Sequence, residues 1–458
     1  MRGLVSLLNT ARDGLQASSY ALGVTGQNVA NVNTPGYARR DVVLETRGQG
    51  LNGVHATGIK RASDAILERR EYQSSSMSSG ASERDSHLAQ LEGLFDDAGG
   101  SGLADSVGAL FGSFQSLASN PNDPTARSNV LARADVFAKR VSDTADAIAS
   151  GRDDMFGQAR DTVKDVNQRA QSIAKLNQEI ARAKASGQDT SDLEDQRNQA
   201  LLGLATLIDV RTVADASGAI MVQSAGTTLV EGGNARTFTV DLAPGGNLRL
   251  LSSTAGGSNT EVTQFLTGGK LAGIQQARDV DYVAVQTQLD SFAFSVANAV
   301  NTQHEAGYGL DGNTGRALFD LTATSAGAAR SLRVSADVAG QPNFIAASST
   351  AAGLPGNSAN AVALSNLTDA LVVGGRSITN AYSDIVGNVG QRKAAAEQDV
   401  TLRQSIADQV HQMRESVSGV SLDEEMISMT KYQRAYEASA KVLSTVDQLL
   451  EELLARLG

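Results

Sequence analysis

A few short segments contain residue types that could do chemistry. His304-Glu305 resembles the start of a zinc-protease motif, in which two histidines one helical turn apart bind the metal. The residues that follow are Ala306, Gly307 and Tyr308, so the second histidine is missing and the glycine should end the helix. We therefore interpret His304 and Glu305 as polar residues at a helix end and predict no zinc site there.

Acidic residues occur in two other suggestive arrangements. Asp311–Gly315 resembles half of a calcium loop, but Thr322 occupies the twelfth position, where an EF-hand has glutamate, so we expect a glycine-rich turn. Asp423, Glu424 and Glu425 are adjacent, and neighbours on a helix point in different directions, so they suit the start of a helix rather than acid–base catalysis. The sequence predicts no catalytic residues, no metal and no cofactor, and hence a protein that is not an enzyme.

Composition narrows the possible classes further. The chain has 458 residues, a net charge of −11, 4% aromatic residues without tryptophan, and no cysteine. The absence of cysteine excludes disulfides and thiolate sites. The basic residues form no cluster longer than Arg39-Arg40 or Arg69-Arg70, which argues against nucleic-acid binding. No run of apolar residues is long enough to span a membrane. Residues 1–9 do not resemble a cleaved signal peptide, so we expect that any export uses another route.

Apolar residues recur at coiled-coil spacing at both ends of the chain, in residues 4–29 and 421–457. Such a stripe must be covered by another helix, so we expect the two helices to pair with each other, with neighbouring subunits, or with both. Spacing alone leaves open that both stripes are simply intramolecular core. The apolar residues that we predict to form an assembly interface are Leu4, Leu8, Leu15, Leu22, Val29, Leu422, Met426, Met429, Tyr436, Leu443, Val446, Leu450 and Leu453.

The first helix should end near Asn31 and lead into a turn. Pro35-Gly36 suits the central positions of a type II turn, in which the glycine has a positive φ. The residues of this predicted turn are Asn31, Asn33, Thr34, Pro35, Gly36 and Tyr37.

The period of the apolar residues predicts a mainly α fold with a small β insert. We expect residues 63–208 to form several helices, among them one around Val130–Ile148 and a separate, longer one from Val163, and we expect helix again within 263–304. Period-two segments separated by glycine turns indicate strands within 209–262.

The predicted architecture is elongated and nested, with the two terminal helices paired as a coiled coil and the β insert farthest from them. The predicted units are 1–62 (first helix and extended segment), 63–208 (helical bundle), 209–262 (β domain), 263–304 (bundle), 305–370 (irregular, rich in Gly, Ala and Ser), 371–415 (last bundle helix) and 416–458 (terminal helix).

Several motifs resemble those of one family. The segment Gln27–Tyr37 closely resembles the N-terminal signature of the axial proteins of the bacterial flagellum, which are its rod, hook and hook-associated subunits. Ser418–Met426 and Lys431–Leu443 resemble the matching C-terminal box, in the form found in hook-associated members. Three internal segments support the hook-associated branch: Asp123–Arg127, Asp195–Asn198 and Asn301–Gly307.

The resemblance implies a structural subunit of the hook–filament junction. It implies a ring or helical homo-oligomer joined through the terminal helices, located outside the cell in the flagellum after type III export. The implied partners are the hook protein, a second hook-associated protein on the filament side, and an export chaperone that binds the C-terminal helix, with no nucleic acid and no membrane. Two alternatives stay open: a hook or distal-rod subunit, and a secreted adhesin or surface-binding protein that uses the flagellar export route.

Overall fold

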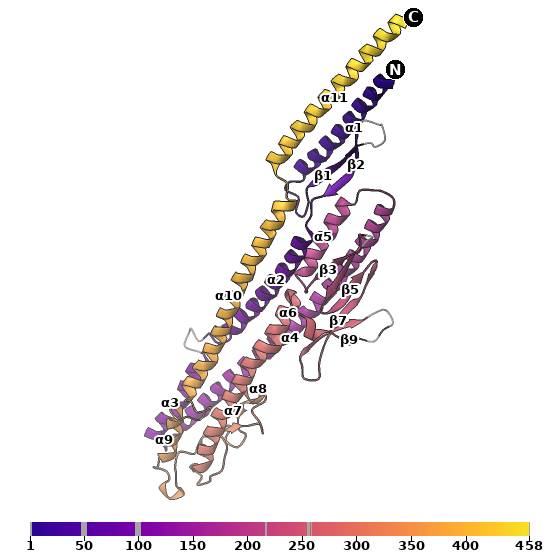
Figure 1. Cartoon of the computed structure of the whole chain (residues 1–458). Coiled ribbons are helices and arrows are strands. Elements are labelled where there is room, and N and C mark those ends of the chain that lie inside the picture. Colours follow the sequence, from indigo (N-terminus) through magenta and orange to yellow (C-terminus); the bar gives the residue numbers. More distant parts are fainter. Residues whose placement is uncertain are drawn as a thin grey trace.

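The molecule is elongated, with both chain ends at one end of its long axis (Figure 1). The structure is a computed structural model that describes residues 2–46, 53–96, 102–215, 218–253, 257 and 259–457. Helices make up 66% of the chain, and the sheets are small. The predicted mainly α, elongated architecture with long terminal helices is therefore confirmed.

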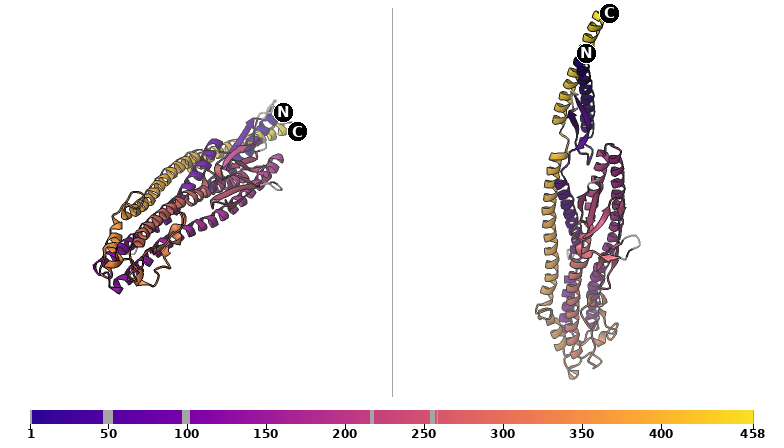
Figure 2. Two further views of the ribbon diagram at one scale, coloured as in Figure 1. Left: turned by 90° about the horizontal axis from the view of Figure 1, so that it is seen from below. Right: turned by 45° about the vertical axis from the view of Figure 1, so that its right-hand side comes forward.

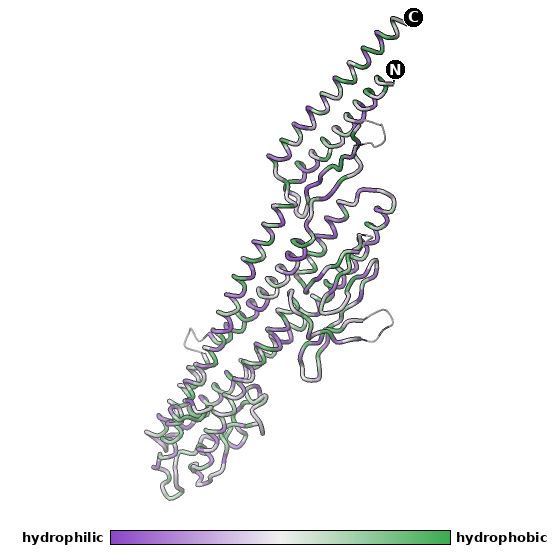
Figure 3. The backbone as a smooth tube through the Cα atoms, in the orientation of Figure 1, coloured by the Kyte–Doolittle hydropathy of each residue, from purple (hydrophilic) through white to green (hydrophobic). Residues whose placement is uncertain are grey.

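The two ends of the chain form one unit, which we call the terminal module. Helix α1 (Arg2–Ala30) lies beside α11 (Leu422–Leu457), and an antiparallel hairpin of β1 (Arg40–Thr46) and β2 (Val54–Arg61) packs against α1. In the right-hand view of Figure 2 the module extends beyond the rest of the molecule along its long axis. Hydrophobic residues recur along both helices towards their far ends (Figure 3).

A bundle of long helices forms the main body. Large apolar side chains such as Phe114, Phe137 and Phe292 fill one continuous core. The helices of the bundle are α2 (Ala65–Gly93), α3 (Leu103–Ser119), α4 (Pro124–Ala185), α5 (Ser191–Ala205), α6 (Gly269–Gln276), a π-helical turn (Ala277–Asp281), α7 (Tyr282–Ala306) and α10 (Ile378–Ser418).

The predicted break between residues 148 and 163 is wrong, because α4 runs through it as one helix of 62 residues. Gly151 lies inside this helix and allows close packing: a Cβ atom there would lie 2.9 Å from the Tyr282 ring. Burial of α4 residues on both sides of this point, including Ile148 and Met155, keeps the helix covered and continuous.

The β insert lies beside the middle of the molecule and not at the end farthest from the termini, so that prediction was wrong (Figure 1). Two asparagines of α4 fix this position. The Asn167 side chain exchanges two hydrogen bonds of 2.8 Å with the backbone of Phe238, and Asn177 donates to the carbonyls of Ile220 and Gly232.

The insert contains a four-stranded and a three-stranded antiparallel sheet, and the strands lie close to the segments that the alternation predicted. The strands are β3 (Arg211–Ala214), β4 (Ile220–Ser224), β5 (Thr227–Glu231), β6 (Asn234–Ala235), β7 (Thr237–Leu242), β8 (Leu248–Ser253) and β9 (Thr260–Glu261), and a 3-10 turn (Thr263–Phe265) follows. One of the glycine turns predicted between these strands spans residues 215–218 and includes 216 and 217, which lie outside the described residues.

The end opposite the termini is built from α3 and the irregular segment that follows α7 (Figure 1). This segment contains the short elements β10 (Phe319–Asp320), α8 (Ala328–Ser331), β11 (Arg333–Val334) and α9 (Ala359–Ser365), with 3-10 turns at Pro342–Phe344, Ala351–Gly353 and Asn366–Thr368.

Candidate assembly surface and its joint to the bundle

Helices α1 and α11 approach each other closely because small residues line α1. Ala11, Ala17 and Ala21 are buried, and a Cβ atom added at Gly14 would lie 2.8 Å from the hydroxyl oxygen of Ser439 on α11. The predicted pairing of the chain ends is therefore present within one subunit.

The predicted α1 residues are only partly covered by this pairing. The buried positions of the stripe carry small side chains, Ala11, Ser18 and Thr25. The large side chains that the sequence assigned to the interface are all half-buried: Leu4, Leu8, Leu15, Leu22 and Val29. Each of these five residues therefore keeps apolar surface that a second molecule could cover.

The predicted α11 residues fall into two groups. Val446 is buried, and Met429, Leu443 and Leu450 are half-buried. The remaining four keep a large exposed fraction: Leu422 47%, Met426 63%, Tyr436 42% and Leu453 41%. The first of these groups contributes to the packing within the chain, whereas the second leaves much of its surface uncovered.

Sequence reasoning missed further apolar residues on the module surface. Ile427 is 70% exposed on α11, and Val5 and Leu7 are 55% and 51% exposed on α1. These residues lie off the heptad stripe, and an unpartnered apolar side chain off the stripe has no periodic signal that would reveal it.

A buried asparagine joins α1, the turn and α11. Asn28 is 1% exposed, and its amide nitrogen donates 3.0 Å hydrogen bonds to the Arg40 carbonyl and to a Glu425 carboxylate oxygen. Its amide oxygen accepts from the Arg40 backbone N–H at 3.0 Å and from the Tyr37 hydroxyl at 2.8 Å. The sequence analysis did not single out Asn28, because α1 carries many polar residues and only the structure shows which of them join it to distant segments.

The predicted turn is present. Gly36 has φ +81°, and the Tyr37 backbone N–H donates to the Thr34 carbonyl at 3.2 Å, which closes the turn. Asn31 stabilises the helix end, because its side chain donates to the Gln27 carbonyl and accepts from the Thr34 hydroxyl. Asn33 and Pro35 are exposed. The turn redirects the chain from α1 into the hairpin.

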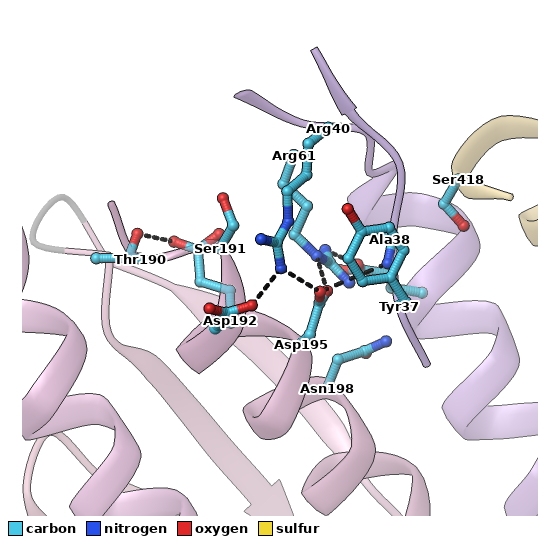
Figure 4. A network of polar contacts seen from close by, with 12 residues as sticks. Tyr37, Ala38, Arg40, Arg61, Thr190, Ser191, Asp192, Asp195, Asn198 and Ser418 are labelled. Carbon is cyan, nitrogen blue, oxygen red and sulfur yellow. Dashed lines mark hydrogen bonds and ion pairs between the residues drawn. The ribbon is translucent and has the colours of Figure 1, made fainter. Parts of the chain in front are cut away.

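The hairpin is joined to the bundle by a group of charged residues, shown in Figure 4, that we call the joint cluster: Arg40, Arg61, Asp192 and Asp195. Asp195 of α5 accepts from Arg61 Nε at 2.6 Å, from Arg40 Nη2 at 3.4 Å and from the Ala38 backbone N–H at 3.5 Å. Arg40 also pairs with Asp192. These bonds connect the terminal module directly to α5.

Burial and ion pairing oppose each other in the joint cluster, and ion pairing prevails. Burial lowers the pKa of Arg40, but the hydrogen bond to Asp192 and the nearby carboxylates raise it above its usual value. Arg61 follows the same pattern, with its hydrogen bond to Glu68 opposing the effect of burial on its pKa. Both guanidinium groups therefore stay charged, as the ion pairs require.

The internal motifs outside the terminal module have structural roles. Asp195 belongs to the joint cluster, Asn198 accepts a hydrogen bond from the buried Tyr72 hydroxyl, and Arg197 donates to the Gly218 carbonyl at 2.8 Å. Arg127 is fully buried and donates to the Pro121 and Ile345 carbonyls, and burial lowers its pKa to about 10.

The segments considered for metal binding are occupied by structural contacts. His304 Nδ1 lies 2.7 Å from the Arg316 carbonyl, and its Nε2 accepts from the Ala346 backbone N–H at 3.0 Å. Asp311 binds the Arg316 guanidinium. Among the described residues, no group of three His, Cys, Asp or Glu side chains is placed to hold a metal ion. Within the same residues, no helix has the length and hydropathy that a membrane crossing needs.

Comparison with known proteins accounts for this arrangement. Residues 88–319 match the family described as "Flagellar hook-associated protein FlgK helical domain", which covers about half of the chain. The chain belongs to the FlgK family of flagellar hook-associated proteins. Residues 8–37, which hold most of α1 and the turn, match "Flagella basal body rod protein", and residues 412–457 match "Flagellar basal body rod FlgEFG protein C-terminal".

Curated FlgK relatives align over nearly their whole length. The chain is 28% identical to "Flagellar hook-associated protein 1" of Bacillus subtilis over 500 residues, covering 98% of each chain. It is 27% identical to the protein of that name from Salmonella typhimurium over 552 residues, covering 98% of this chain and 99% of the relative. The chain is thus a structural protein of the flagellar hook–filament junction.

A solved structure supports the fold. "The structure of the flagellar hook junction protein FlgK from Burkholderia pseudomallei" aligns with a TM-score of 0.68 at 18% identity, covering 76% of this chain and 100% of that one. At this identity the match bears on the fold alone.

Proposed function

We propose that the terminal module is the part of this FlgK-family subunit through which neighbouring subunits join at the junction. The observation that carries the proposal is incomplete burial. The large apolar residues of the α1 stripe are half-buried, and Leu422, Met426 and Tyr436 on α11 are exposed, although their spacing suits a helix–helix seam.

The surplus apolar surface lies on helices that other contacts already hold in place. Asn28, Glu425 and the joint cluster hold the module in shape without using the exposed side chains. A helix face of this kind is stabilised when a second molecule covers it, because burial of apolar area is favourable and roughly proportional to that area. The occupants that we propose are the terminal modules of further copies of this chain.

The proposal extends to partners and location. We infer that the module contacts the hook protein on one side and a second hook-associated protein on the filament side, and that the assembled protein is extracellular after type III export. The exposed apolar residues of α11 would need cover before export, and we propose an export chaperone that binds this helix. Support comes from the names of the relatives and from the exposed residues themselves.

A matched pair of variants tests the interface. Met426→Asp places a charge on an exposed apolar position of the stripe, and Thr445→Asp places the same charge on an exposed α11 position outside it. We expect Met426→Asp to fold and be exported normally but to fail to incorporate, giving cells with bare hooks and subunits in the medium. Thr445→Asp should swim normally.

The measurements are thermal unfolding of the purified chain, immunoblotting of the medium and electron microscopy of the flagella. Normal filaments with Met426→Asp would contradict the proposal. A loss of swimming with both variants would also count against it, because the effect would then follow charge on α11 and not the stripe.

A further inference from the structure

The terminal module and the bundle meet at a narrow polar joint, and its contacts form a connected series. At one end the Arg39 backbone N–H donates to the carbonyl of Ser418, the last residue of α10, at 2.8 Å. On the α5 side the joint cluster supplies the ion pairs, with Asp195 between Arg40 and Arg61.

Asp195 is the centre of this joint. Its side chain is 12% exposed. Its two carboxylate oxygens accept hydrogen bonds from Arg40, from Arg61 and from the Ala38 backbone N–H, which are three groups from the start and the end of the hairpin. A carboxylate that accepts from both strands of a hairpin fixes the direction in which that hairpin leaves the bundle.

The C-terminal helix is linked to the same cluster through Asn28. Glu425 lies 397 positions away in sequence, is 5% exposed, and accepts one N–H of the Asn28 amide. The other amide contacts of Asn28 hold both backbone polar groups of Arg40 and the Tyr37 hydroxyl. The Arg40 guanidinium lies 4.7 Å from the centre of the Tyr37 ring. Asn28 and Tyr37 therefore position both the backbone and the side chain of Arg40.

We propose that docking of α11 onto α1 sets the orientation of the terminal module relative to the bundle, with Glu425 acting through Asn28 and Arg40 on Asp195. When Glu425 is absent, one N–H of a fully buried amide has no acceptor, and an unsatisfied buried donor is unfavourable enough to displace the amide. Arg40 then loses the two backbone hydrogen bonds to Asn28, and its guanidinium is no longer directed towards Asp195. The joint is stiff with α11 docked and loose without it.

Such a joint gives a junction subunit two distinct states. A subunit with a loose joint presents its module in many directions, whereas a subunit with a docked α11 presents one defined surface. The inference concerns the free chain and is tested on it, so its failure and a failure of the proposed assembly surface give different results.

The absence of cysteine makes the test direct, because two introduced cysteines can carry spin labels without background. Ser19→Cys places one label on an exposed position of α1, and Lys175→Cys places the other on α4, where the Lys175 side chain is 77% exposed. Electron–electron distance measurements then report how widely the module moves relative to the bundle.

Two near-isosteric substitutions isolate the hydrogen bond. Glu425→Gln keeps an oxygen that can accept from Asn28, and Glu425→Met keeps length and helix propensity but offers no oxygen. We expect a narrow distance distribution for the parent and for Glu425→Gln, and one at least about twice as wide for Glu425→Met and for Asp195→Asn, as for a hinge released from its contacts.

Glu424→Met is the matched control, because Glu424 pairs with Arg39 at 2.8 Å but its side chain is 65% exposed. Its distribution should stay narrow. Equal widths for Glu425→Gln and Glu425→Met, whether both narrow or both wide, would overturn the link through the Asn28 hydrogen bond. A narrow distribution for Asp195→Asn would overturn the role of the joint cluster. Far-ultraviolet circular dichroism checks that the total helix content is unchanged in each variant.

Discussion

His304 gives the protein a pH-dependent stability whose size follows from its surroundings. The imidazole is fully buried, its Nδ1 donates to the Arg316 carbonyl, and its Nε2 accepts from the Ala346 backbone N–H. Only the neutral ring can make both bonds, because protonation turns Nε2 into a donor that faces another donor. Burial lowers the pKa of His304 from 6.5 to about 4.

The sign and magnitude of the effect follow from linkage. Between pH 4 and 6.5 the unfolded chain binds a proton at this histidine that the folded chain does not bind, so the free energy of unfolding rises with pH across this range. A shift of this size corresponds to about 3 kcal/mol, present above pH 6.5 and lost as the pH falls towards 4.

The assay is urea unfolding of the full chain and of His304→Gln, measured from pH 4 to 7.5. The other three histidines are present in both proteins, so the difference between the two curves isolates His304. We expect the parent to be the more stable protein at pH 7 and the difference to shrink as the pH is lowered. A difference that stays constant across this range would refute the assignment of a neutral, doubly bonded ring.

Three further perturbations test the terminal module. Gly36→Val should destabilise the module by about 1–3 kcal/mol, because φ is +81° there and the new side chain would overlap Gln199; faster hydrogen exchange in the hairpin would show this, and unchanged exchange would contradict it. Val446→Asp should lower the protection of α1 and α11 by a few kcal/mol through a buried charge, unlike the exposed Thr445→Asp. Asn28→Asp should open the module near neutral pH by placing a second carboxylate beside Glu425, and Glu425→Gln should partly restore it; hydrogen exchange that matches the parent would show that the carboxylates do not meet.

The elements that the sequence analysis located correctly are those with local signals. Heptad spacing marks α1 and α11, Pro35-Gly36 marks the turn, and alternation between glycine turns marks the strands of the β insert. Each of these signals depends on residues within one turn or one hairpin, so the local chain determines the outcome.

The features that it missed depend on contacts between distant segments. The break expected between Ile148 and Val163 is absent, because distant segments cover α4 there: Ile148 and Met155 are buried, and the Tyr282 ring packs against Gly151. The position of the β insert depends on Asn167 and Asn177, whose partners lie 43 to 71 residues further along the chain. The spacing of residues within one segment carries no information about such partners.

The motif Asp195–Asn198 shows how a resemblance can identify a segment without explaining it. The motif marked these residues as typical of the family, but it did not explain why the fifth residue of α5 is an aspartate. The structure supplies the reason, since Asp195 meets Arg61 and Arg40 from 134 and 155 residues away. The role of a residue whose partners lie this far away in sequence is visible only in the folded chain.

The terminal helices carry two kinds of surface, and the difference between them bears on how a subunit can be both stable and able to assemble. Small residues and Asn28 complete the contact between α1 and α11, so the pair can form in one chain. Large residues beside that contact, such as Leu15 and Met426, keep exposed area that the pair does not use. If the large residues closed the pair, the apolar area left for a neighbour would be small. Because they lie beside it, a folded subunit retains the surface that we propose its neighbours cover.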